Sequence, residues 1–189
     1  MEDQGINKTP DQKITEFYKK NRRKFYLIFG LILIVFLGLI LILNLQKNKN
    51  QNVSDDFNSA NILIANEELE NAKKLLIKVI KNKNKFYSPL ALNTIIEQEL
   101  YNTPLEVIEM YDTVINISGL DEENKELIKF KKALFLLNSA NEGEMIKVMK
   151  SIIDNDSVWK LKAINFLIEF YTSKKNIEEA NNYKKLLNK

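Results

Sequence analysis

The chain has 189 residues, a formal net charge of +3, five glycines, three prolines and no histidine or cysteine. The absence of His and Cys excludes zinc sites built from those residues, Cys- or His-based nucleophilic catalysis, haem ligation by His, and disulfide bonds. The net charge is small and is concentrated near the N-terminus, so it does not indicate a nucleic-acid-binding protein.

The N-terminal tail, residues 1–24, is polar and shows no sustained apolar periodicity. Its membrane-proximal end is basic, with Lys19, Lys20, Arg22, Arg23 and Lys24. Beyond the apolar segment that follows, only Lys47 and Lys49 precede Asp55 and Asp56. The positive-inside rule therefore predicts a cytoplasmic N-terminus, and we interpret the five basic residues as topology determinants rather than as a lipid or nucleic-acid site.

Residues 25–45, FYLIFGLILIVFLGLILILNL, form an uncharged apolar run with Asn44 as its only strongly polar side chain. At 1.5 Å per residue this helix would be about 30 Å long, the thickness of a bilayer's hydrocarbon core. Residues 43–53 offer no small residue for a signal peptidase, so we expect an uncleaved signal anchor. The sequence thus predicts a single-pass protein whose remaining domain lies across the membrane.

Residues 46–52, QKNKNQN, form a polar connector that the sequence leaves open as either helix or flexible linker. From 53 to 189, apolar residues recur every three and four positions and do not alternate, which predicts an all-α domain. The expected helices span 53–65, 69–83, 89–101, 104–117, 122–138, 142–154, 158–173 and 177–188.

Capping residues mark several of these boundaries. Ser88 and Thr103 each precede a proline, and Asp121 stands before Glu122 and Glu123. A cap followed three residues later by glutamate, the spacing of a capping box, occurs at Thr103 with Glu106, Asn141 with Glu144, and Asn176 with Glu179.

The eight helices group into four hairpins, with turns expected near Glu67, Thr103, Ala140 and Lys175. This spacing is close to the period of about 34 residues that is typical of a tetratricopeptide repeat. Small residues at Ala60, Ala72 and Ala180 stand where that repeat packs its two helices closely. We therefore predict a tetratricopeptide-repeat-like (TPR-like) α-solenoid, against an irregular helical bundle as the alternative.

The helix expected at 158–173 is apolar around most of its circumference, so it either lies between neighbours or exposes an apolar surface to a partner. We predict the central position, with Trp159 packing between the third and fourth hairpins.

The layout resembles the YfgM-type ancillary subunit of the SecYEG translocon. The resemblance is most specific at Ser157–Ala163 (SVWKLKA), Phe170-Tyr171 and Ile177–Ala180 (IEEA), although Lys175 stands where that family often has glycine. It implies a bacterial inner-membrane protein with its repeat domain in the periplasm. It also implies attachment to translocon subunits and a membrane-anchored periplasmic chaperone, and assistance to nascent secreted chains.

The acidic pairs of the chain lie near predicted helix starts, where the helix dipole accounts for them, and no phosphate-binding or nucleophile motif is present. We therefore expect a binding protein, not an enzyme, with no cofactor, metal or small-molecule substrate. If Ala72 and Ala180 mark equivalent positions, the first helices of three of the hairpins offer groove-facing candidates, although each could simply be solvated. They are Asn61, Asn93, Glu97, Asn165 and Glu169. None is a Lys or Arg, which argues against a groove that grips a C-terminal carboxylate. The alternative function is a self-associating protein of envelope assembly or cell division.

Overall fold

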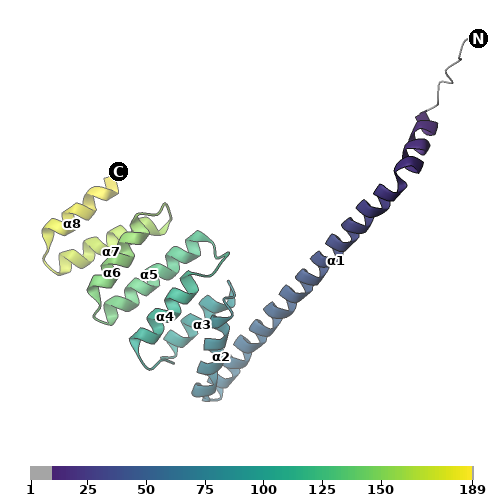
Figure 1. Ribbon diagram of the computed structural model, residues 1–189. Coiled ribbons are helices and arrows are strands. Elements are labelled where there is room, and N and C mark those ends of the chain that lie inside the picture. The colour runs from purple at the N-terminus through teal and green to yellow at the C-terminus, as the bar shows by residue number, and fades with distance from the viewer. Residues whose placement is uncertain (1–9, 189) are drawn as a thin grey trace, which may run out of the picture. The chain divides into compact units, whose positions relative to one another are not determined.

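Figure 1 shows the computed structural model, which describes the backbone of residues 10–188. It describes the side chains of these residues except 10, 12–18, 25, 41, 42, 44–46, 48, 49 and 188. Residues 1–9 of the predicted tail lie outside the described part. Within residues 10–188 every element is helical, as the sequence predicts. The chain divides into two units, Met1–Lys49 and Asn50–Lys189.

Helix α1 runs without a break from Pro10 to Ala65. It contains a segment, Lys19–Ile40, that is long and apolar enough to cross a membrane, with a mean hydropathy of 2.2 and no burial against the protein. The helix also includes residues 10–24, for which the sequence predicted no helix, and the connector 46–52. Proline is absent from residues 11–65, and a helix that has been nucleated propagates where no proline interrupts it.

The second unit contains the end of α1 and seven further α-helices in sequence. They are α2 (Leu69–Lys81), α3 (Tyr87–Glu97), α4 (Pro104–Ile115), α5 (Glu122–Asn138), α6 (Glu142–Ile153), α7 (Trp159–Ser173) and α8 (Ile177–Lys184), with a 3₁₀ turn at Lys185–Asn188. From α2 onward each helix packs against its neighbour in sequence, and α5 also contacts α7 while α2 contacts α4. In Figure 1 the helices of this unit lie side by side in chain order.

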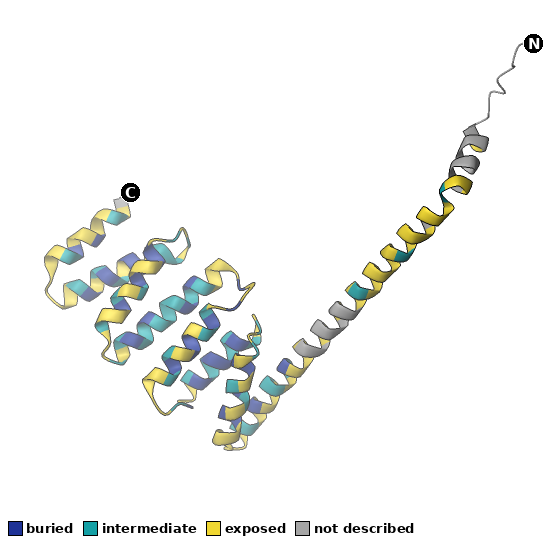
Figure 2. Ribbon diagram, viewed as in Figure 1, coloured by how far each residue is buried: buried dark blue, intermediate teal, exposed yellow. Residues whose placement is uncertain are grey.

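The core of the second unit forms two apolar clusters that meet along α5. One contains residues from Val53 to Ile128, and the other contains residues from Ala133 to Tyr183. Ala60, Ala72 and Ala180 are at most 1% exposed, so these small residues are buried in the core. Figure 2 shows the buried positions distributed along helices of both clusters, so the core is continuous along the unit and not concentrated at one point.

The four odd-numbered helices, α1, α3, α5 and α7, end in the same turn. A residue with positive φ follows each helix: Glu67 (62°), Glu99 (52°), Ala140 (58°) and Lys175 (58°). The next backbone N–H donates to the carbonyl five residues earlier, at 2.8–2.9 Å, in the pairs Glu68–Leu63, Leu100–Ile95, Asn141–Leu136 and Asn176–Tyr171. This is the Schellman arrangement that usually places glycine at the positive-φ position.

Three turns therefore lie where the sequence predicts them, and the second does not. Helix α3 ends at Glu97 and its turn residue is Glu99, whereas the prediction extended the helix to 101 and placed the turn near Thr103. The left-handed conformation of Glu99 stops the helix, and the remaining residues form a connection to Thr103.

The predicted caps are confirmed at Thr103, Asp121, Asn141 and Asn176, whose side chains each accept a hydrogen bond from the backbone N–H three residues later. The Ser88 cap is wrong. Ser88 lies inside α3, and its buried hydroxyl donates to the Val79 carbonyl (2.9 Å) in the last turn of α2. The carboxamide of Asn84 instead accepts the N–H groups of Phe86 and Tyr87, so it caps this helix start.

Glu106 of α4 forms an ion pair that links two hairpins. Its carboxylate accepts from the Asn102 N–H (2.9 Å) and pairs with Lys73 of α2 (3.2 Å). The hydrogen bond from the Asn102 backbone, aided by Lys73, lowers the pKa of Glu106. A carboxylate with a lowered folded-state pKa stabilises the fold fully above its unfolded pKa, near 4.5, and this stabilisation is lost as pH falls through the folded value.

We therefore expect Glu106→Gln to show a smaller drop in melting temperature than the unmodified chain when the pH is lowered from 6 to 3. Thermal unfolding in detergent at each pH measures this difference. Glu109→Gln, an exposed change on the same helix, is the control and should follow the unmodified chain. Equal pH dependence in all three proteins would contradict the role assigned to Glu106.

Candidate partner-binding groove

The five groove candidates lie on odd-numbered helices: Asn61 on α1, Asn93 and Glu97 on α3, and Asn165 and Glu169 on α7. Asn93 is half-buried, and the other four are exposed. Asn93 lines a pocket, and none of the other four contributes to its wall. Of the five candidates, Asn93 is therefore the one that lies in this pocket.

This pocket lies between α3 and α5 and has a volume of about 270 Å³. Its apolar wall is formed by Phe86, Pro89, Leu90, Leu92, Leu120, Leu127 and Ile128 together with Tyr111, and its polar wall by Lys85, Asn93, Asn124 and Lys131. The volume is below the roughly 300–1,000 Å³ of typical small-molecule sites. It suits a side chain of another protein better than a cofactor.

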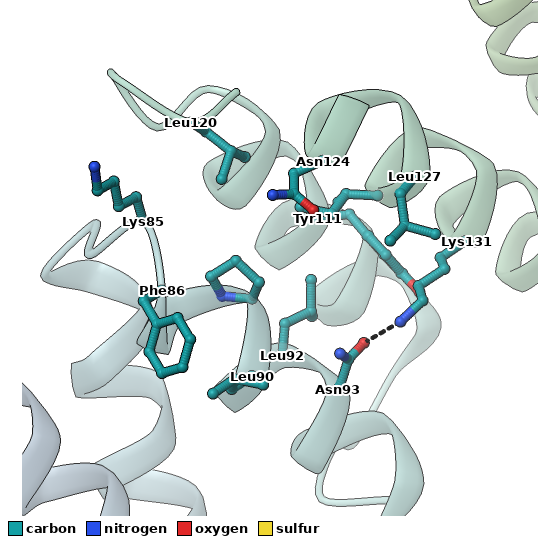
Figure 3. A pocket seen from close by; sticks show the side chains of 12 residues that line it. Lys85, Phe86, Leu90, Leu92, Asn93, Tyr111, Leu120, Asn124, Leu127 and Lys131 are labelled. Atoms are coloured by element: carbon teal, nitrogen blue, oxygen red, sulfur yellow. Dashed lines mark hydrogen bonds between the residues drawn. The ribbon is translucent and has the colours of Figure 1, made fainter. Parts of the chain in front are cut away.

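The charge of the pocket is positive because its wall contains two lysines and no carboxylate. The Lys131 ammonium donates to the side-chain oxygen of Asn93 (3.1 Å), a neutral partner, as the dashed line in Figure 3 shows. By contrast, Lys132, the next residue on α5, pairs with Asp112. In Figure 3 Lys85 and Lys131 lie on opposite sides of the pocket, so positive charge flanks the apolar wall.

Tyr111 does not offset this charge. It is 3% exposed, and burial raises the pKa of its phenol to about 12, so the ring stays neutral at physiological pH. The pocket therefore offers apolar surface next to ammonium groups, which is complementary to an apolar side chain beside a carboxylate.

Sequence reasoning missed the α5 side of this pocket and its lysines. Asn124, Leu127, Ile128 and Lys131 follow the i, i+3, i+4, i+7 spacing of one helix face, so a signal was present. The middle hairpins match the repeat pattern poorly, and aligning the units on Ala72 and Ala180 therefore gave no candidate on α5. None of the five candidates is a Lys or Arg, but the wall of the pocket contains Lys85 and Lys131.

Helix α7 shows both features that the sequence left open. Trp159 packs on Phe130 of α5, with ring centres 5.6 Å apart, which confirms its packing role between the third and fourth hairpins. Ala163, Ile164 and Leu167 are fully buried. The start of the helix nevertheless exposes Val158 (71%) and Leu161 (58%) beside Trp159. This small patch is the second surface on which a partner could pack.

Among the described residues, no three acidic side chains come together as metal ligands would. Comparison of the chain with protein-family models, with curated proteins and with solved structures finds no match in any of the three.

Proposed function

We propose that this chain is a membrane-anchored scaffold that binds segments of other proteins in the pocket between α3 and α5. The pocket carries the proposal, since it combines apolar surface with lysines that have no carboxylate partner in its wall. The apolar segment of α1 supports the anchor, because its length and composition meet the requirements for a membrane span.

The domain belongs, in this proposal, to the TPR-like solenoids. The same turn geometry ends each of the four odd-numbered helices, which supports four repeated hairpins. The buried alanines at 60, 72 and 180 support it as well. Stacked hairpins of this kind use the groove along their first helices to hold peptides. The pocket lies between two such helices.

The bound segment carries a large apolar side chain close to an Asp or Glu. The apolar side chain packs on Leu127, Ile128 and their neighbours, and the carboxylate pairs with Lys131. This charge complementarity increases the specificity and the association rate, because Lys85 and Lys131 attract acidic segments and repel basic ones.

The N-terminal basic cluster supports a cytoplasmic N-terminus, so in this proposal the repeat domain lies on the opposite side of the membrane. The resemblance to the YfgM-type subunit suggests that this side is the periplasm of a bacterial inner membrane. Lys19, Lys20, Arg22, Arg23 and Lys24 are all exposed. The resemblance to the YfgM-type subunit suggests translocon subunits, a membrane-anchored periplasmic chaperone and nascent secreted chains as partners.

Co-purification in mild detergent tests this function. We expect the full chain to recover translocon subunits or the membrane-anchored chaperone, and Lys131→Glu to lower that recovery about tenfold or more, because like charges at an interface are strongly unfavourable. The matched control is Lys150→Glu, an exposed change on α6 outside the pocket, which should leave recovery unchanged.

Two results would contradict the proposal. Recovery of neither partner by the unmodified chain would argue against the translocon assignment. Equal recovery by Lys131→Glu and Lys150→Glu would argue against the pocket as the binding site. Helix content measured by circular dichroism establishes that both variants are folded.

The exposed Val158 and Leu161 favour self-association as the second candidate function. A stable oligomer of the purified chain that dissociates on Leu161→Asp, with unchanged recovery of other proteins by the Lys131→Glu variant, would support it over the scaffold.

A further inference from the structure

The segment Lys81–Phe86, which runs from the last residue of α2 to the residue before α3, has an unusual surface, and we call it the basic loop. Lys81, Lys83 and Lys85 are exposed, and Phe86 exposes 63% of its surface. The chain has no Asp or Glu between Glu70 and Glu97, a stretch that contains six lysines, at 73, 74, 78, 81, 83 and 85. The loop therefore combines concentrated positive charge with an exposed aromatic ring.

Asn84 fixes this loop on α1. Its side-chain oxygen accepts from the N–H groups of Phe86 and Tyr87, both at 2.9 Å, and its amide nitrogen donates to the side-chain oxygen of Asn50 at 2.8 Å. Ser54 adds a second tie by donating to the Tyr87 hydroxyl at 2.7 Å. The basic loop is thus held beside the first residues of the second unit.

Asn50 lies five residues after Leu45, the end of the predicted apolar run. Five residues span at most about 18 Å when fully extended and about 7.5 Å in a helix. This limit follows from chain length alone and does not depend on how the two units are oriented. If the apolar run crosses a bilayer, the Asn84 contact must lie close to the headgroups.

The other two loops that join an even-numbered helix to the next odd-numbered one have the opposite charge. The α4–α5 connection ends in Asp121 next to Glu122 and Glu123, and the α6–α7 connection contains Asp154 and Asp156. Positive charge therefore occurs in the one loop that is tied to the start of the second unit. A bilayer with anionic lipids attracts lysines within about 8–10 Å of its surface.

We propose that the Lys81–Phe86 loop binds the anionic surface of the bilayer in which the chain is anchored. The lysine ammonium groups bind lipid phosphates, and the Phe86 ring sits at the interface. This inference rests on the proposed membrane anchor, and the loop shares Lys85 and Phe86 with the wall of the pocket.

Lysine acetylation of the full chain in nanodiscs, read residue by residue by mass spectrometry, tests the contact without any substitution. We expect Lys81, Lys83 and Lys85 to react on the order of threefold more slowly in nanodiscs with 30% phosphatidylglycerol than in phosphatidylcholine alone. High salt should remove the difference. Lys150, Lys184 and Lys185, all exposed, are internal controls and should react equally in both lipids.

A second measurement uses the absence of native cysteine. Phe86→Cys labelled with an environment-sensitive dye should brighten in the anionic nanodiscs. The triple change Lys81→Gln, Lys83→Gln and Lys85→Gln should abolish that response. The matched triple change at Lys150, Lys184 and Lys185 should preserve it.

The outcomes separate this inference from the proposed anchor. A chain that enters nanodiscs but shows equal lysine reactivity in both lipids overturns the lipid contact and leaves the anchor standing. Protection that is equal in both lipids and insensitive to salt also overturns it, since it indicates a contact between copies of the chain. A chain that does not enter nanodiscs overturns the anchor and this inference together.

Discussion

Replacing Glu126 by alanine is expected to lower the free energy of unfolding by about 2–4 kcal/mol. Glu126 lies in α5 with a side chain that is 0% exposed. One carboxylate oxygen, Oε1, accepts from Lys129 at 2.6 Å and from the Asn155 amide at 2.7 Å. The second bond ties α5 to the connection between α6 and α7, so the change affects the junction of two hairpins.

The magnitude is a balance of opposing terms. Two hydrogen bonds to a buried charge contribute roughly 1.5–3 kcal/mol each, and truncation also leaves a cavity. Burial of the carboxylate is itself costly, and Oε2 is buried without a hydrogen-bond partner among the described protein atoms. The Glu126→Ala change removes the cost of burying the carboxylate together with its two hydrogen bonds. The expected loss of stability is therefore smaller than the sum of the two hydrogen bonds and the cavity.

Two variants make the measurement specific. Glu126→Gln keeps the accepting oxygen and should cost about 1 kcal/mol or less. Glu144→Ala removes an ion pair with the same i, i+3 spacing and the same 2.6 Å distance to Lys147, but with exposed partners, and should change stability by less than about 1 kcal/mol. Chemical denaturation gives all three values. Equal losses for Glu126→Ala and Glu144→Ala would contradict the role of burial.

Local signals in the sequence were sufficient for most of the fold. A three-to-four periodicity predicts the helices, and the side chains of Thr103, Asp121, Asn141 and Asn176 mark where four of them begin. Each of these features acts within one or two turns of helix, so no knowledge of distant contacts is needed.

Two features were missed because a distant contact decides them. Ser88 has the sequence features of a cap but donates to a carbonyl of α2, nine residues earlier, while Asn84 takes over the cap. The buried environment of Glu126 depends in the same way on Asn155, 29 residues away. A glutamate between Lys125 and Leu127 gives no local sign that it is buried.

The candidate site was only partly predictable for the same reason. Asn93 was identified from its place on the first helix of a hairpin. Lys131 follows it by 38 residues and becomes part of the site only because α5 lies opposite α3 across the pocket. Lys85 and Phe86 belong both to this pocket and to the basic loop. In the proposed arrangement, a segment bound in the pocket therefore lies near the membrane surface, which favours membrane proteins and emerging chains as partners.

Introducing glycine at the four turns that end α1, α3, α5 and α7 is expected to stabilise the second unit by roughly 2–4 kcal/mol. Glu67, Glu99, Ala140 and Lys175 all have φ between 52° and 62°. A left-handed conformation costs an L-residue roughly 1–2 kcal/mol, and glycine avoids this cost. Glycine also loses more entropy on folding, by roughly 0.5–1 kcal/mol, which leaves a net gain of about 0.5–1 kcal/mol at each turn.

The gains should add, because the four turns end four different helices and additivity holds for distant sites. Chemical denaturation of the four single variants and of their combination measures this. The helix content should stay the same, since the turn hydrogen bonds join backbone atoms and do not depend on the replaced side chains.

The matched control compares one residue type in two conformations. Lys175→Gly acts at a turn with φ of 58° and should stabilise, whereas Lys74→Gly acts at an exposed position inside α2 and should destabilise by about 1 kcal/mol. If both changes destabilise, the positive φ at Lys175 is not a source of strain. If they differ in sign, the turns are held by their backbone geometry and by the packing of the helices on either side. The usual glycine of this turn is then not required for the fold, which explains how a regular series of hairpins can form in a chain with only five glycines.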